Sequence, residues 1–261
     1  MSSDSSAKAF SKVCSESARA SAEYSMLQNN DKVLATLSGG ADSFVMLETL
    51  LELKKRAPFD FILEAVSFDP CFPELDIQKI ARYCQDRGVV HHTVVLDVPS
   101  LLASSPQKRF RRPCVWCSRM RRGKLYGKAQ DLKANKLALG HHADDLLESF
   151  LISLVRGQGL TTMAPNVQAD NGELRIIRPL ALVQETLVKQ AAGYFNFPLA
   201  GECPFKEDLE RSGDRAWAKE QIKLWNKRIP NLHKLMLKSL GKAELDWLLD
   251  KRYISYFNTD K

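Results

Sequence analysis

The sequence lacks the features of several common protein classes. No apolar run approaches the ~20 residues of a membrane-spanning helix, and the first residues lack the basic-then-apolar order of a signal peptide. Asp4, Glu16 and Glu23 argue against a transit peptide, which is poor in acidic residues. Six cysteines without secretion signals do not indicate a disulfide framework, and there are no internal repeats. We therefore expect a cytoplasmic protein that does not bind a membrane.

The chain also lacks the two common phosphate-binding motifs, GxxxxGK[ST] and GxGxxG. Residues 38–43 instead read SGGADS, between an apolar stretch over 33–37 and a helical pattern. We expect a strand that turns sharply into a helix, whose free amides and positive dipole end bind anions. The alternative is a glycine turn that opens an ordinary helix.

Each residue type in this turn suits a bound phosphate. Gly39 and Gly40 let a phosphate approach the backbone, and serine hydroxyls add donors. Asp42 would repel a bare phosphate, so we expect it to hold a metal ion between itself and the phosphates. The hexad resembles the SGGxDS signature of the PP-loop ATP pyrophosphatases.

Strands and helices alternate along most of the chain. After a helix over 7–28, we expect strands at 32–37, 61–68, 91–96 and 136–139 and one that ends over 176–179. Helices are expected at 43–56, 74–87, 118–133, 144–156 and 184–195, and irregular segments at 97–113 and 157–173. Short joints between such elements predict an α/β fold with a Rossmann-like, doubly wound parallel sheet. Ligands then bind beyond the carboxyl ends of the strands.

The expected organisation has three parts. Residues 1–28 form an N-terminal helical segment, 29–200 an ATP-binding domain with an inserted CxxC loop, and 201–261 a C-terminal helical region. Three or four amphipathic helices are expected in the last part. We expect core packing for its large apolar residues, namely Trp217, Leu224, Trp225, Leu235 and Trp247.

Cys114 and Cys117 lie three residues apart at an expected loop-to-helix junction, so both sulfurs face one side. The helix N-terminus and nearby arginines are expected to favour thiolates. The residues alone leave open a redox pair, a zinc site with Cys203 as third ligand, an iron–sulfur cluster on three cysteines, or inert thiols. Cys14, Cys71 and Cys84 are expected to be small core residues.

Positive charge is concentrated in one segment. The net charge is +7, and residues 108–128 hold nine Lys or Arg and no acidic residue. Such a cluster is typical of a nucleic-acid surface, although a solvated helix face is the alternative. Its candidate RNA-binding residues are Arg109, Arg111, Arg112, Arg119, Arg121 and Arg122.

The stretch GHHADD, residues 140–145, is a second candidate site. Gly140 lets the chain turn close to a ligand, and Asp144 and Asp145 fall in the first turn of the following helix. The alternative is an acidic N-cap beside two histidines that have structural hydrogen bonds.

The order of these motifs resembles one family. SGGADS, PCVWCSRMRRGKLY, LALGHHADD, the Gly157–Pro165 loop, IIRPL and a late lone cysteine follow the pattern of the tRNA-cytidine 2-sulfurtransferase (tRNA 2-thiocytidine synthetase) family, from about residue 20 to 228. The CxxCSRxRRGxLY block is the most specific part, because neither ATP binding nor metal binding alone requires it.

The resemblance implies ATP-dependent thiolation of an anticodon-loop cytidine of tRNA, at position 32. It also implies Mg²⁺, a 4Fe–4S cluster, sulfur from a sulfide or a desulfurase persulfide, and a homodimer. By position, the cluster ligands would be Cys114, Cys117 and Cys203, which together with Asp42 would be the catalytic set. ATP would contact Ser38, Gly39, Gly40, Asp42, Ser43, Gly140, His141 and Asp144.

One residue departs from the family pattern. Members often carry Lys where this chain has Ala41, and its loss removes a contact to phosphate, although related PP-loop enzymes have a small residue there. Alternative functions are thiolation of a uridine, lysine attachment to RNA, or a non-catalytic RNA- or metal-binding protein. A small-molecule desulfurase is a further alternative that needs neither ATP nor the basic segment.

Overall fold

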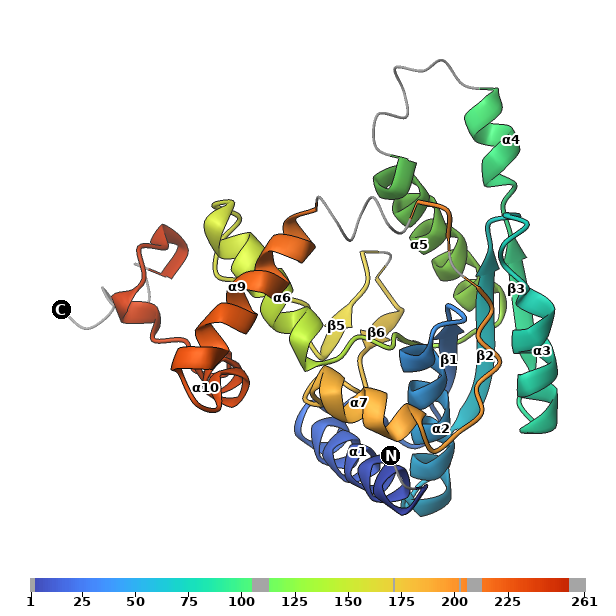
Figure 1. Ribbon diagram of the computed structural model, residues 1–261, viewed down its shortest axis with the longest axis horizontal. Helices are drawn as coiled ribbons and strands as arrows, with labels where there is room; N and C mark the ends of the chain where they lie inside the picture. Colours follow the sequence, from blue (N-terminus) through green and yellow to red (C-terminus); the bar gives the residue numbers. More distant parts are fainter. Residues whose placement is uncertain (1–2, 105–112, 171, 202, 206–212, 254–261) are drawn as a thin grey trace.

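The computed structural model describes residues 3–104, 113–170, 172–201, 203–205 and 213–253. Within them a six-stranded sheet has the order β3-β2-β1-β4-β6-β5 (Figure 1). The strands are β1 (Lys32–Leu37), β2 (Ile62–Asp69), β3 (His91–Val95), β4 (Lys136–Ala138), β5 (Asn166–Gln168) and β6 (Arg175–Ile177). All pairings are parallel except that of β5 with β6, which confirms the predicted α/β class.

Helices cover both faces of this sheet because apolar residues alternate along its strands. Val33, Ala35 and Leu37 of β1 join the core formed with α1 (Ser3–Glu23), α2 (Ala41–Arg56), α3 (Ile77–Asp86) and α7 (Glu185–Ala192). Leu34 points the other way and packs with Leu125 of α5 (Pro113–Asp131). The doubly wound arrangement follows from this alternation.

The C-terminal helices have a separate apolar cluster. α6 (Ala143–Val155) packs against α9 (Asp214–Arg228) and α10 (Leu232–Leu240). Two short 3₁₀ turns follow, η1 (Leu245–Trp247) and η2 (Lys251–Tyr253). The cluster is formed by Leu147, Leu151, Ala218, Ile222 and Leu232. No helix in the described ranges combines the length and apolarity needed to cross a bilayer.

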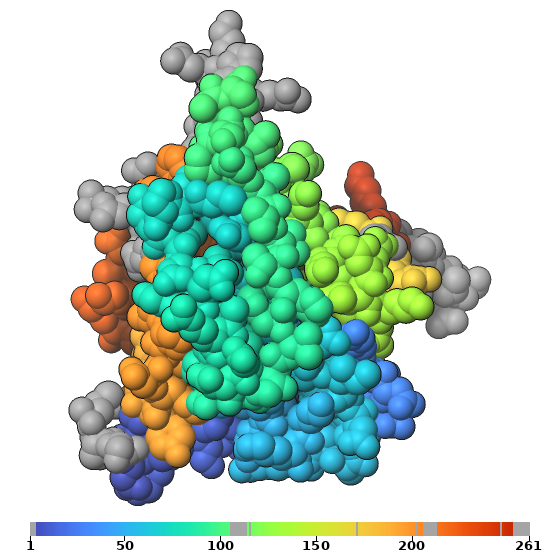
Figure 2. Space-filling view, turned by 90° about the vertical axis from the view of Figure 1, so that its right-hand side faces the viewer, coloured from blue at the N-terminus to red at the C-terminus, as the bar shows by residue number. Residues whose placement is uncertain are grey.

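Three predicted boundaries were wrong. The segment 97–113 contains α4 (Val98–Ala103), which projects at the top of Figure 2; its proline sits in the first turn, and Asp97 accepts a bond from the Ser100 amide. α5 starts at Pro113 rather than at 118, so the CxxC at the predicted junction forms the first turns of the helix. The loop over 157–173 contains β5, whose three residues include one apolar side chain and give no periodic signal.

The prediction of core packing for the C-terminal aromatic residues was also wrong. Trp217, Leu224, Trp225 and Leu235 are exposed, and Trp247 is 84% exposed. Small or aliphatic residues instead form the contacts of α9 and α10 with α6. The amphipathic pattern of α9 therefore marks two faces, of which only one is covered.

A short segment before Cys203 crosses the turn that follows β1. The Ala200 amide donates to the Gly39 carbonyl at 3.2 Å, and the Asp76 amide donates to the Ala200 carbonyl at 2.8 Å. A Cβ atom on Gly39 would lie 2.5 Å from the Cβ of Ala200, and one on Gly201 would overlap the Glu74 carbonyl. We call residues 199–201 the strap, and it fits only because both positions are glycine.

Gly201→Ala tests how tightly the strap is held. Gly201 has φ +99°, and the added methyl would meet the Glu74 carbonyl, so the free energy of unfolding should fall by about 2 to 4 kcal/mol. Gly159→Ala is the matched control, since φ is +94° with nothing within 4 Å, and should cost about 1 kcal/mol. Urea unfolding measures both. Equal losses would show that the Glu74 contact does not hold the strap.

Candidate functional site

The turn after β1 is shaped by its own serine hydroxyls. The Ser43 hydroxyl donates to the Gly40 carbonyl at 2.7 Å and accepts from the Ser38 amide at 3.2 Å. Gly40 is the N-cap of α2 and offers no side-chain acceptor to the first turn. The N-cap thus leaves the first turn of α2 without a side-chain acceptor, and the binding of an anion there stays a prediction.

The start of α6 lies against the same turn. A Cβ on Gly140 would lie 3.2 Å from the Cα of Ser43 and 3.3 Å from the Asp42 carbonyl. Only a glycine lets these two chain segments approach so closely. The structure thus brings Gly140 to the SGGADS turn, and two helix N-termini meet there.

Acidic side chains converge beside Asp42. Burial raises the pKa of Asp42, the nearby His142 lowers it, and the carboxylates of Asp145 and Glu185 raise it further. Asp145 is paired with Arg215 and Glu185 with Lys189 and Lys219, so Asp42 is the carboxylate of the three that is left to bind a divalent ion together with a ligand's own oxygens. Asp145 and Glu185 were not among the predicted site residues, although Asp145 stands in the GHHADD stretch.

Asp144 is held by its neighbours. Its carboxylate accepts the Glu185 amide at 2.7 Å and lies 2.9 Å from Nε2 of His233 on α10. The hydrogen bond to Asp144 raises the pKa of His233. The two side chains line a polar cavity of about 280 Å³ with Gln184, Thr186, Asn226 and Asn231. Asp144 therefore ties α6 to α7 and α10.

His141 is neutral and fixed by an arginine that the sequence analysis did not single out. Arg178 Nε lies 3.2 Å from His141 Nδ1, and the Arg178 side chain is itself buried. Burial, opposed by Asp145 and assisted by Arg178, lowers the pKa of His141 to about 4. Arg178 is the arginine of IIRPL, so that motif contained the signal. Because Nδ1 accepts, the ring proton is on Nε2.

The three cysteines of the predicted cluster site are neighbours. Cys114 and Cys117 lie in the first turns of α5, and the Cys114 thiol lies 3.8 Å from the Phe205 carbonyl in the segment of Cys203. Burial raises the pKa of Cys117; Arg121 lowers it, and Cys203 and Cys114 raise it. The expectation that arginines favour the thiolate is thus wrong for Cys117, because burial outweighs Arg121. Within the described ranges, no three His, Cys, Asp or Glu side chains form a group that could hold a metal ion.

Arg121 connects this cysteine group with the GHHADD stretch. The positive charge of its guanidinium lowers the pKa of Cys117 in the cysteine group and that of His141 in the GHHADD stretch. Arg119, Arg121 and Arg122 are exposed on α5. Arg109, Arg111 and Arg112, also predicted to bind RNA, lie outside the described residues.

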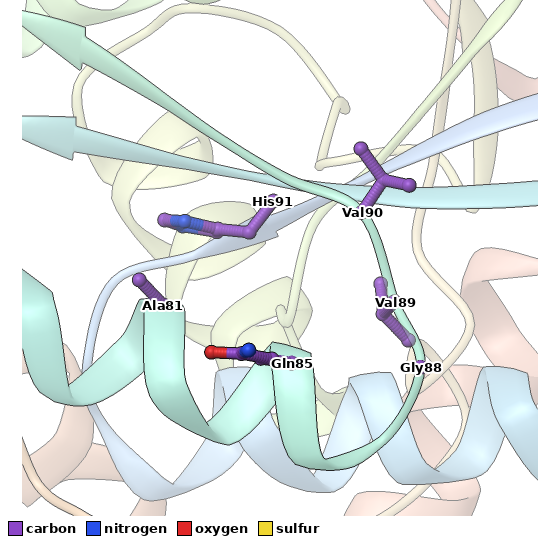
Figure 3. A pocket seen from close by; sticks show the side chains of 6 residues that line it. All are labelled: Ala81, Gln85, Gly88, Val89, Val90 and His91. Atoms are coloured by element: carbon purple, nitrogen blue, oxygen red, sulfur yellow. The ribbon is translucent and has the colours of Figure 1, made fainter.

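A second hollow lies at the other end of the sheet. It has a volume of about 380 Å³ and is lined by α3 and the start of β3, as Figure 3 shows. Its only titratable side chain is His91, which lies 2.9 Å from the Ser67 hydroxyl. Because β3 begins there, the hollow is remote from the strand ends that carry the SGGADS turn.

Comparison with known proteins places the chain in a family. Residues 10–196 match the PP-loop domain. The tRNA-cytidine(32) 2-sulfurtransferase of Burkholderia cenocepacia (strain HI2424) is 36% identical over 248 residues, which are 93% of this chain and 72% of that protein. The enzyme of the same name from Azotobacter vinelandii is 35% identical over 239 residues, covering 90% and 84%.

A solved structure shares the fold. The U34-tRNA thiolase NcsA from Methanococcus maripaludis, with its 4Fe–4S cluster, gives a TM-score of 0.72 at 21% identity and covers 89% of this chain and 78% of its own. With these matches, the chain belongs to the PP-loop proteins and to the family of the tRNA-cytidine(32) 2-sulfurtransferases.

Proposed function

We propose that this protein is a tRNA sulfurtransferase that uses ATP to replace the C2 oxygen of cytidine 32 with sulfur. The relatives carry this activity in their names. The observation that supports it most is the strap, because it joins the phosphate-binding turn to the segment of Cys203 within a few residues. Nucleotide activation and sulfur chemistry then share one location.

ATP would bind at the two helix N-termini beside Gly140. Amides of the first turn of α2 would receive the phosphates, with Ser38 and Ser43 holding the turn in shape. Asp42 would bind Mg²⁺ together with those phosphates, since its acidic surroundings favour a cation. Neutral His141 would donate from Nε2 without adding charge to the cleft.

The first chemical step would activate the base. The C2 oxygen attacks the α-phosphate of ATP, which gives an adenylated cytidine and releases pyrophosphate. The α2 amides stabilise the charge that develops on the departing pyrophosphate. Sulfide then attacks C2, the C2–O bond to the adenylate breaks, and AMP leaves; a persulfide donor would in addition need a thiol reductant to cleave its S–S bond. No net oxidation or reduction occurs when sulfide is the donor.

Cys114, Cys117 and Cys203 would hold the iron–sulfur cluster. The charges of Cys114 and Cys203 act on Cys117, so the three thiols lie near one another. The tRNA thiolase that shares this fold is described with a 4Fe–4S cluster, which favours a cluster over zinc. When bound, a 4Fe–4S cluster on three thiolates supplies an iron that is open to a sulfur ligand. Because the pKa of Cys117 is raised, binding releases protons.

The basic face of α5 would receive the tRNA. Arg119, Arg121 and Arg122 are exposed beside the cysteines and would contact phosphates, and Arg109, Arg111 and Arg112 would extend this surface. The target base must leave its stack to reach the cleft, which is easiest in an anticodon loop.

Cys117→Ser tests the cluster assignment. Loss of one of three thiolates should remove the visible absorption and most of the iron of anaerobically purified protein, and 2-thiocytidine should no longer form in tRNA. Cys71→Ser is the matched control, because the Cys114, Cys117 and Cys203 thiols do not act on Cys71, and it should keep both. Thiolation by an iron-free Cys117→Ser protein would refute the assignment. A 2-thiouridine product would instead support the uridine alternative.

Asp42→Asn tests the nucleotide site. The neutral amide loses the metal ligand, so tRNA-dependent release of pyrophosphate should fall by about 100-fold or more, while the isosteric side chain preserves the fold. Asp86→Asn, in the last turn of α3, makes the same change at an exposed position and should leave the rate unchanged. An unaltered rate in Asp42→Asn would exclude the proposed role.

A further inference from the structure

The C-terminal helices are joined directly to the candidate site. Arg215 of α9 lies 3.5 Å from Asp145, and Lys219 of α9 lies 3.0 Å from Glu185. His233 of α10 contacts Asp144. Each contact joins α9 or α10 to the N-terminus of α6 or α7. The C-terminal helices therefore lie against the starts of α6 and α7 beside the candidate site.

This outer surface is strongly basic. α9 and α10 contain two acidic residues, Asp214 and Glu220, against Arg215, Lys219, Lys223, Lys227, Arg228, Lys234 and Lys238. The last five cations are exposed, and no carboxylate in the described part of the chain pairs with any of them. Their charges are therefore open to a partner.

The placement of these lysines helps the helices only in part, since Lys227 and Lys238 lie in last turns, where the helix dipole favours a cation. Lys223 and Lys227 are four residues apart on α9, and Lys234 and Lys238 are four apart on α10, so each pair repels. Lys234 also lies in the first turn of α10, where the helix dipole disfavours a cation. A polyanion bound across both helices would remove these penalties.

Aromatic side chains accompany the charge. Trp217 and Trp225 are 40% and 39% exposed, and Leu224 and Arg228 share the face of Trp217 at helical spacing. Exposed indoles between cations bind nucleic acids by stacking as well as by charge. The centre of an interface between two protein chains is instead depleted of lysine. The combination favours RNA over a second copy of this chain.

We propose that α9 and α10 form a second surface for the tRNA, with lysines on phosphates and Trp217 on a base or ribose. That the RNA is a tRNA rests on the proposed function. The inference that this surface binds RNA rests on its lysines and tryptophans alone. In Figure 1, α9 lies to the left of β5 and β6 and α5 lies to their right. The tRNA would then be held from two sides.

Lys223→Ala/Lys227→Ala tests the phosphate contacts. The lost repulsion offsets the lost interaction of Lys227 with the helix dipole, so α9 should keep its stability and a loss of affinity reports on binding. We expect about tenfold weaker tRNA binding, and the slope of log affinity against log salt should fall by roughly 1.5. Lys54→Ala/Lys55→Ala is the matched control in the last turn of α2, far from the site. Equal affinity and slope in the two variants would overturn the proposal.

Trp217→Ala tests the stacking contact. Affinity should fall at every salt concentration while the slope stays that of the wild type, because no phosphate contact is lost. Sedimentation equilibrium of this variant checks the competing partner. A smaller mass than the wild type, with unchanged tRNA affinity, would make the surface an interface between copies and overturn the proposal.

Thiolation of the bound tRNA, measured by nucleoside mass spectrometry on the same samples, separates the two proposals. If the wild type binds tRNA through these lysines but does not thiolate it, the proposed function is refuted and the RNA-binding surface is supported. If the wild type thiolates tRNA and the Lys223→Ala/Lys227→Ala variant binds tRNA as well as its control does, only the proposed RNA-binding surface is refuted. A wild type that binds no tRNA refutes both.

Discussion

The contact between Gly39 and Ala200 is the constraint on which the arrangement of the site depends. It fixes the SGGADS turn against a segment that comes about 160 residues later in the sequence and leads directly to Cys203. The α6 start closes the same turn from the other side through Gly140. Three parts of the chain therefore meet at glycines, and the contacts between their backbones determine how the segments are positioned in the candidate site.

Electrostatics at this meeting point is divided between two environments. Around Asp42, burial and the carboxylates of Asp145 and Glu185 raise the pKa of its carboxyl, while ion pairs with Lys189 and Lys219 lower that of Glu185. Around His141, Arg178 and burial keep the imidazole neutral. Arg121 reaches this second environment and the thiols on α5. The nucleotide and sulfur halves of the proposed chemistry thus share one charged neighbour.

Much of this fold could be predicted because local patterns determine it. β1 was predicted at its observed bounds, since buried parallel strands give short apolar runs bounded by turn residues. The SGGADS turn and Gly140 were found because glycines at close approaches are visible in a sequence. α4 was missed because a proline in a first helical turn looks like a loop signal.

The parts that could not be predicted depend on tertiary contacts. Nothing local indicates that Arg178 would bond to His141, or that Asp144 would turn to His233 while Asp145 and Glu185 affect Asp42. The exposure of Trp217 and Trp247 was also hidden, because periodicity shows an apolar face but not whether anything covers it. Burial likewise decided the protonation of Cys117 against the local arginines.

The raised pKa of Cys117 has a consequence for the two thiols of the CxxC. A protonated sulfur is a poor nucleophile and oxidises slowly, so burial protects two thiols one helical turn apart from closing on each other in air. If these cysteines hold a cluster as proposed, the burial that makes its assembly depend on proton loss also preserves the ligands before assembly.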